Sequence, residues 1–278
     1  MTLNASDTAS QAVAPSDILQ RNLVDNGILR LTLNDAKRRN ALSNEMMHQL
    51  AQALTTAASD DSIRVIILAA NGPAFCAGHD LKQIKAGRSA DDNGQAYFTE
   101  VFENCAALMQ QIVNHPKPII AEVTGIATAA GCQLVASCDL AIAAKSSTFA
   151  TPGVHIGLFC STPMVALSRN VSNKQAMEML MVGEGVSAKK AARIGLINKA
   201  VNDKKLREVT MQMAAKIANK STMTVSVGKQ AFYAQREMPL ADAYLYASDV
   251  MVQNLLKPDA IEGIDAFVEK RKPQWTDQ

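Results

Sequence analysis

Three short apolar segments constrain the fold of this chain more than any other feature. Residues 63–70, 118–125 and 140–144 are rich in Ile, Val, Leu and Ala, and each contains at most one charged side chain. Such runs are typical of strands buried on both faces, as in parallel sheets. The stretches 94–114 and 130–137 have helical periodicity. Alternating strands and helices predict an α/β fold with a mostly parallel sheet.

The flanking regions extend this pattern. Residues 28–34 alternate like a half-buried strand, and residues 43–60 have helical spacing with Ser43 as the expected N-cap. After about residue 160 the remainder is mainly helical in period, without a clear linker or internal repeat. We expect three parts, a disordered N-terminal lead at 1–20, an α/β core at 21–200 and a C-terminal helical region at 201–278.

Composition excludes several kinds of function. The net charge is +2, aromatic residues make up 4% of the 278, and no basic block stands out. This balance argues against nucleic acid as the main partner. No apolar run approaches the ~20 residues of a membrane span, so no membrane partner is expected.

The cysteines and the N-terminus bear on the compartment. Five cysteines, an odd number, include no C-x-x-C pair, which argues against a disulfide framework and a zinc ribbon. Residues 1–20 contain no apolar signal core. A reducing compartment and the absence of a recognisable signal predict a cytoplasmic protein.

Two loops could carry chemistry. Both "NGPAFCAGHDLKQI" (71–84) and "GIATAAGCQLVAS" (125–137) follow a buried strand, contain small residues and lead into a helix. Loops of this kind can leave backbone N–H groups unpaired, and one N–H from each would form a hole for a developing oxyanion. Neither loop alone is specific, because small residues also serve close packing.

Familiar catalytic motifs are absent from the sequence. It has no G-x-G-x-x-G after a strand, Walker A loop, G-x-S-x-G elbow or H-E-x-x-H. His48 has the pattern of a structural or solvated side chain, and His115 has no evident partner. His79 lies in the first loop beside Asp80, where it is either part of a site or an ordinary loop histidine.

Four segments, in order, resemble the crotonase (enoyl-CoA hydratase/isomerase) superfamily. The resemblance runs from about Leu23 to the C-terminus, and within the superfamily the chain looks closest to the enoyl-CoA hydratase domain-containing protein 3 group. The segments are "LNDAKRRNALSNEM", "AFCAGHDLKQI", "GIATAAGCQLVASCDLAIAAKSSTFATPGVHIGL" and "FVEKRKPQW".

This resemblance implies a fold, an assembly and a ligand. The fold would be a spiral of ββα turns with a C-terminal helical trimerisation region, assembled as a homotrimer or a dimer of trimers. The ligand would be an acyl-CoA or enoyl-CoA thioester, with coenzyme A as part of the substrate and no separate cofactor or metal. The resemblance places the oxyanion hole at the backbone N–H groups of His79 and Ala130, where the side chain of His79 would matter little.

The resemblance also implies contacts with coenzyme A. They would come from the 36–41 loop, the first hole segment and the C-terminus, the last reaching a neighbouring subunit's ligand. The residues concerned are Lys37, Arg39, Ala41, Ala77, Gly78, Asp80, Leu81, Lys270 and Lys272. Ordinary solvation is the alternative for the four cations among them.

Both glutamates that family hydratases use to activate water are replaced here. The resemblance aligns their positions with Gln133 and Gly153, while Asp80 and Asp139 match structural positions. A glutamine can orient water but cannot take a proton from it at neutral pH, and glycine offers no side chain. Other groups could substitute or could simply be packed in the core, namely Cys132, Cys160 and Ser161.

Three functions remain open from the sequence. The first is a lyase-type enoyl-CoA hydratase/isomerase with weak or relocated acid–base chemistry. The second is a decarboxylase of a malonyl-type CoA, because loss of CO₂ generates an enolate without a base, and "AGHD" also resembles the methylmalonyl-CoA decarboxylase branch. The third is an acyl-CoA-binding protein without turnover.

Overall fold

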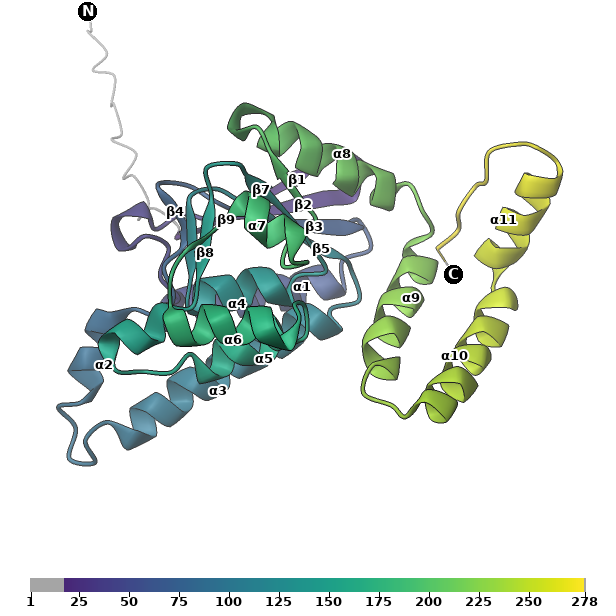
Figure 1. The fold of residues 1–278 in the computed structure, drawn as a ribbon. Coiled ribbons are helices and arrows are strands. Elements are labelled where there is room, and N and C mark those ends of the chain that lie inside the picture. The colour runs from purple at the N-terminus through teal and green to yellow at the C-terminus, as the bar shows by residue number, and fades with distance from the viewer. Residues whose placement is uncertain (1–17, 278) are drawn as a thin grey trace, which may run out of the picture.

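The computed structural model of the protein describes residues 18–277 (Figure 1). The expected lead at 1–20 lies outside this range except for its last three residues. Leu19 and Gln20 already belong to the first strand, so the folded part begins slightly before the expected boundary.

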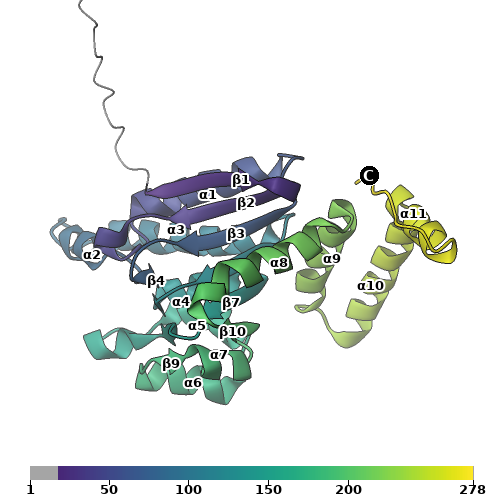
Figure 2. The ribbon, with the colours of Figure 1, turned by 90° about the horizontal axis from the view of Figure 1, so that it is seen from above.

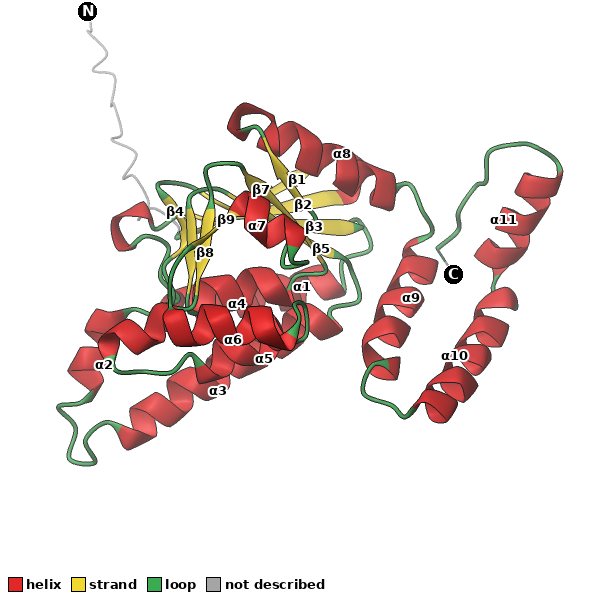
Figure 3. Ribbon diagram, viewed as in Figure 1, coloured by secondary structure: helices red, strands yellow, loops and turns green. Residues whose placement is uncertain are grey.

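Within residues 18–277 the chain forms two β-sheets surrounded by helices (Figure 3). The larger sheet has the order β1-β2-β3-β5-β7-β10 and is parallel except for β1, while the smaller has the order β4-β6-β8-β9. The strands are β1 (Leu19–Val24), β2 (Ile28–Leu33), β3 (Val65–Ala70), β4 (Ala74–Cys76), β5 (Ile119–Val123), β6 (Ile126–Thr128), β7 (Leu140–Ala144), β8 (Thr148–Ala150), β9 (Val186–Ser187) and β10 (Lys199–Val201).

The helices follow the strands in a repeating order. Each of β3, β5 and β7 in the large sheet is followed by a strand of the small sheet and then by a helical segment. The helices are α1 (Asn44–Ala58), α2 (Leu81–Gly87), α3 (Gln95–Asn114), α4 (Ala130–Ser137), α5 (Ser161–Ser168), α6 (Asn173–Val182), α7 (Ala188–Arg193), α8 (Leu206–Ala218), α9 (Thr222–Gln235), α10 (Leu240–Leu255) and α11 (Pro258–Val268). Short 3₁₀ turns are η1 (Asp25–Gly27), η2 (Ala36–Arg38), η3 (Pro152–Ile156) and η4 (Asp203–Lys205). This is the ββα repeat that the resemblance implied.

The apolar strand segments are buried on both faces, as their composition predicts. In β3, Ile66 and Leu68 join the main core, while Val65 and Ile67 face the opposite side. There they pack with small residues of α8, which lies across the sheet (Figure 2). A strand covered on both faces needs apolar side chains at every position, which explains why the run is continuous.

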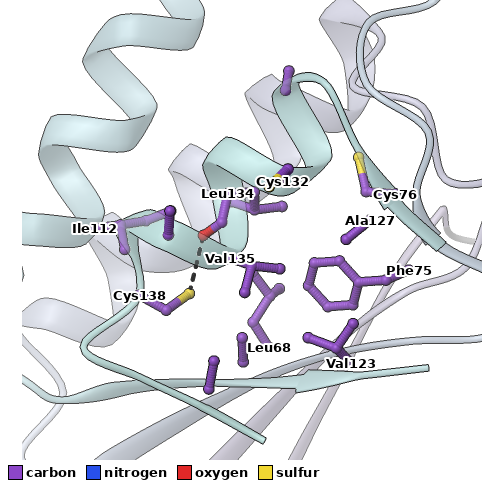
Figure 4. Close-up of a cluster of buried hydrophobic side chains, with 14 of the residues drawn as sticks. Leu68, Phe75, Cys76, Ile112, Val123, Ala127, Cys132, Leu134, Val135 and Cys138 are labelled. Carbon is purple, nitrogen blue, oxygen red and sulfur yellow. Dashed lines mark hydrogen bonds between the residues drawn. The ribbon is translucent and has the colours of Figure 1, made fainter. Parts of the chain in front are cut away.

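Helix α4 is the most deeply enclosed helix of the fold. All eight of its residues are buried. Figure 4 shows Leu134 and Val135 of α4 close to Phe75 and Leu68, with the Cys138 thiol donating to the Leu134 carbonyl at 3.3 Å. The helix that begins at the second loop is therefore fixed by the core.

The last three helices extend from the α/β core, which, within residues 18–277, only α9 contacts through buried hydrogen bonds. Figures 1 and 2 show α9, α10 and α11 as an arm beside it, and α10 has no buried residue. The helical region expected from residue 201 thus divides, since α8 packs on the sheet and only the part after Ala218 forms the arm. No helix in the described part of the chain is long and apolar enough to cross a membrane.

Candidate functional site

The two candidate loops lie side by side because the strands before them pair. Strand β4 runs parallel to β6, with Cys76 opposite Ala127. The residues that follow, Ala77 to His79 on one loop and Ala129 on the other, therefore leave the small sheet at the same edge.

Two glycines allow the loops to touch. A methyl group at Gly131 would lie 2.1 Å from the Cys76 carbonyl oxygen, so α4 can approach β4 this closely only without a side chain there. A methyl group at Gly78 would lie 3.0 Å from Cβ of Ala129 and 3.4 Å from the backbone nitrogen of Ala130. Gly78 also has φ +89°, which favours glycine.

The backbone N–H groups of His79 and Ala130 remain free to bind a ligand. Ala130 is the first residue of α4, where N–H groups have no intrahelical acceptor. The neighbours of both residues are bonded, for example Leu42 N to Gly78 O at 2.8 Å and Ala129 N to Ala150 O at 2.9 Å. Within residues 18–277, neither the His79 N–H nor the Ala130 N–H donates to an acceptor.

The backbone at Ala129 is strained. It has φ 51° and ψ −120°, a conformation rarely adopted by residues with a side chain. Strain of this kind costs of order 1–3 kcal/mol and persists where the surroundings enforce it. Here the Ala150 carbonyl and the close approach of Gly78 hold the turn that precedes the Ala130 N–H.

Gln133 lies one helical turn after Ala130. It is 5% exposed, and its Oε1 has no hydrogen-bond partner within the described residues. It also lines a cavity of about 980 Å³ bounded by α3, α4, α5, α9 and α10. A neutral amide here can orient a water molecule or a polar substrate group.

Gly153 is enclosed as well as lacking a side chain. Its N–H donates to the Cys160 thiol at 3.3 Å. A methyl group at this position would lie 2.7 Å from the Leu158 carbonyl oxygen and 2.9 Å from Cys160 Sγ. The space that a second carboxylate would need is thus filled by residues 158–160.

The possible substitutes have the properties of packed residues. Burial raises the pKa of Cys132 to about 12 and also raises the pKa of Cys160, so both remain neutral thiols. A thiol is a much weaker nucleophile than a thiolate. The Ser161 hydroxyl donates to the Phe159 carbonyl at 3.3 Å.

The side chain of His79 packs against an aromatic ring of α3. Its ring meets the Phe102 ring of α3 edge to face, with centroids 5.2 Å apart. Both ring nitrogens are buried, and neither has a hydrogen-bond partner within the described residues. Burial lowers the pKa of His79, so the ring is neutral at physiological pH.

The residues expected to contact coenzyme A fall into two groups. Those near the hole lie on or beside the 36–41 loop, whose Arg39 carbonyl accepts from the Ala77 N–H at 3.1 Å. Lys37 and Arg39 are exposed there, Leu81 is exposed, and Ala41 is buried. The Asp80 carboxylate caps α2 by accepting from Lys82 N at 2.9 Å.

Lys270 and Lys272 form the second group. Both are exposed and follow α11, on the arm away from α2 (Figure 1). Within one chain the structure does not bring them together with Lys37 and Arg39.

Sequence reasoning missed the residue that holds the 36–41 loop. Asn40 is fully buried, and its amide donates to the Asn71 and Ala74 carbonyls, both at 2.8 Å. The available signal was an asparagine beside a small-residue turn, since asparagine tolerates the positive φ of 52° found here.

Two further residues have structural roles. His115, which had no evident partner in the sequence, is buried and bonds to the backbone of Leu54 and Lys117. Asp139 accepts from Ile119 N at 2.7 Å and from Lys229 Nζ at 2.8 Å, which ties two strands to α9. No group of three or more potential metal-binding side chains occurs in the described residues.

The sequence of this chain is similar to a known family and to named proteins. The sequence family described as "Enoyl-CoA hydratase/isomerase" matches residues 24–278. The chain is 49% identical over 250 residues to enoyl-CoA hydratase domain-containing protein 3, mitochondrial, of Rattus norvegicus, covering 90% of this chain and 82% of the relative.

Solved structures agree in fold. One is an enoyl-CoA hydratase of Mycobacterium smegmatis, with 46% identity and a TM-score of 0.89 over 94% of this chain and 99% of that one. Another is human enoyl Coenzyme A hydratase domain-containing protein 3, with 48% identity and a TM-score of 0.88 over 93% of this chain and 100% of that one.

The comparison corrects the expected location. Relatives that are 48–49% identical are named mitochondrial, which points to mitochondria and makes the prediction of a cytoplasmic protein wrong. Free cysteines indicate a reducing environment, but they cannot distinguish one reducing compartment from another.

Proposed function

Because this chain belongs to the enoyl-CoA hydratase/isomerase family, we propose that it binds acyl-CoA or enoyl-CoA thioesters and stabilises the oxyanion that develops on their thioester carbonyl. Coenzyme A would enter as part of the substrate, and the reaction would need no separate cofactor. The exposed loop at Lys37 and Arg39 offers positive charge near the hole for its phosphates.

One observation supports this proposal most directly. Two free N–H groups, of His79 and Ala130, lie on touching loops at the edge of the small sheet. Such preorganised donors can each supply ~3–4 kcal/mol of transition-state stabilisation. They would stabilise the negative charge of an enolate, whether it forms by loss of a proton or by loss of CO₂.

The replaced carboxylates limit the reactions available to this site. Water addition needs proton transfer, and positioned general acids and bases contribute typically 10²–10⁴-fold. Gln133 supplies no such group, and the enclosure of Gly153 leaves no room for one. Carboxylate-dependent hydration should therefore be slow.

Decarboxylation of a malonyl-type CoA is a second candidate, favoured by the filled space beside Gly153. The electrons of the broken C–C bond would pass to the enolate, CO₂ would leave, and a proton would be added at C2. The hole is the main requirement of this reaction.

The test is a mass-spectrometric turnover screen of the purified protein with crotonyl-, longer enoyl-, malonyl-, methylmalonyl- and saturated acyl-CoA. Gln133→Glu should raise hydration by at least about tenfold, since it restores one acid–base group. Gly153→Glu is not suitable as a second substitution, because its side chain would displace Leu158 and Cys160. Gln110→Glu, which lines the same cavity at an exposed position of α3, is the matched control.

Each outcome of the screen indicates a different function for the site. CO₂ release from the malonyl substrates would support the second candidate. Tight binding without any product would identify an acyl-CoA-binding protein. Hydration at rates typical of glutamate-containing family enzymes, unchanged by Gln133→Glu, would contradict the role given to Gln133, and failure to bind every thioester would refute the proposal.

A further inference from the structure

Buried polar atoms without partners occur in the segments that form the hole or adjoin it. In the described part of the chain, six side chains have such an atom. Three of them are His79, Gln133 and Thr151, and the others, Gln175, Thr222 and Asn254, belong to α6, α9 and α10.

These three residues belong to three separate segments that carry or adjoin the hole. His79 belongs to the first loop, and Gln133 follows Ala130 by one helical turn. Thr151 comes directly after Ala150, whose carbonyl accepts from the Ala129 N–H at 2.9 Å. Thr151 is fully buried with an unpaired hydroxyl.

Unpaired buried groups carry a cost that a ligand can remove. Each costs about 1–3 kcal/mol relative to a bonded group. Three such groups in the segments that carry or adjoin the hole therefore favour binding of a polar group there. Of the three, only imidazole accepts and releases protons readily near neutral pH.

We propose that the imidazole of His79 is the acid–base group of this site, which removes a proton from C2 of the bound acyl thioester and returns it. This inference rests on the proposed function, because the thioester must first occupy the hole. The C2–H electron pair becomes the C1–C2 double bond of an enolate, whose oxygen is held by the two N–H groups. The proton moves to the unprotonated ring nitrogen, and the imidazolium returns one to C2 or, in a 3-enoyl thioester, to C4.

The ring can turn toward a substrate. Neither ring nitrogen meets the geometry of a hydrogen bond within the described residues, although the Leu42 carbonyl is close enough to raise the pKa of His79. The residue is partly exposed although both nitrogens are buried, so other atoms carry the exposed surface. A half-turn about the Cβ–Cγ bond exchanges the nitrogens with ring carbons without breaking a hydrogen bond. The edge contact with Phe102 keeps the ring beside the loop.

The surroundings favour a neutral ring that can accept a proton. Burial lowers the pKa of His79, partly offset by the Leu42 carbonyl, with no charged group among the causes. The adjacent Asp80 carboxylate is occupied by the N-terminus of α2 and lies 3.7 Å from Arg38. Phe102, on the facing helix α3, is uncharged.

Deuterium exchange at C2 of butyryl-CoA in D₂O tests this inference without requiring the physiological reaction. Mass spectrometry would follow exchange by wild type, His79→Gln and the control His48→Gln, which removes an exposed imidazole on α1. His79→Gln should slow exchange at least about 100-fold, because a general base is lost, while calorimetry shows retained thioester binding. His48→Gln should match wild type.

Chemical rescue distinguishes a base from a packing role. Added imidazole should restore exchange to His79→Ala, with rates that follow the basicity of substituted imidazoles. Undiminished exchange by His79→Gln, or wild type that binds butyryl-CoA without exchanging it, would overturn the role of His79. Wild type that fails to bind the thioester would instead refute the proposed function.

Discussion

His115 shows how a buried residue can prefer one protonation state. Its Nδ1 accepts from the Lys117 N–H at 3.1 Å, which leaves Nε2 to donate to the Leu54 carbonyl at 3.0 Å. The neutral ring is therefore fully bonded, although the residue is only 2% exposed. Burial lowers the pKa of His115 below its usual value of 6.5 and outweighs the Leu54 and Lys117 carbonyls, which raise it, while the charges of Lys229 and Lys117 act with burial.

This arrangement predicts that acid destabilises the protein. Below about pH 6.5 the unfolded state binds a proton that folded His115 resists, so the free energy of unfolding falls as pH decreases toward the folded-state pKa. Urea denaturation at about pH 7.5 and about pH 5.5 would measure the difference. His115→Gln should reduce this pH dependence, while exposed His48→Gln should retain it. An equal dependence in both variants would contradict the assignment.

At the scale of elements, α9 joins the arm to the core through one buried cation. Lys229 Nζ donates to the Ile112 carbonyl at 3.0 Å, the Lys117 carbonyl at 3.2 Å and the Asp139 carboxylate at 2.8 Å. The Tyr233 hydroxyl donates to the same carboxylate at 3.1 Å. These bonds connect α9 to the end of α3 and to the starts of β5 and β7.

Lys229→Met should therefore weaken this connection. It removes the donor to two carbonyls and the only cation paired with the partly buried Asp139 carboxylate among the described residues, with an expected loss of about 3 kcal/mol in the free energy of unfolding. The substitution should also increase the rate of amide hydrogen exchange in α9 more than in β3. Lys216→Met, at an exposed position of α8, should change stability by less than about 0.5 kcal/mol. Equal stability of the two variants would show that the Lys229–Asp139 pair does not contribute to the free energy of unfolding.

At the scale of the whole molecule, the arm has an apolar surface that one chain does not cover. Leu245 is 73% exposed, Phe267 is 83% exposed, and Leu240 and Tyr244 lie on the same exposed side of α10. Further large apolar side chains of α10 are exposed, namely Met251, Val252 and Leu255, and such an accumulation on one helix indicates an interaction surface. We expect this surface of the arm to contact other copies of the chain, in the homotrimer or dimer of trimers that the resemblance implies.

A charge on this surface should prevent assembly. In light-scattering measurements during gel filtration, wild type should elute as three or six chains, and Leu245→Glu with Val252→Glu should shift it to single chains, because each buried charge costs several kcal/mol. Gln253→Glu adds the same charge at a polar position of α10 and should leave the assembly intact. A monomeric wild type would contradict this expectation.

The sequence alone determined much of the architecture. The segments 63–70, 118–125 and 140–144 became β3, β5 and β7, and Ser43 caps α1 as expected. These features were readable because burial on both faces demands a continuous apolar run, and an N-cap needs a particular side chain. That Gln133 and Gly153 stand where family hydratases have glutamates stays a prediction from the resemblance.

Only the tertiary structure decided how the site is built. The enclosure of Gly153 depends on Leu158 and Cys160, and the contact between Gly78 and Ala130 depends on the pairing of β4 with β6. The three unpaired polar side chains in the segments that carry or adjoin the hole are found only once burial is known. Residue types and local periodicity report what a segment can form, whereas distance, exposure and hydrogen bonding between distant segments arise when the chain packs against itself.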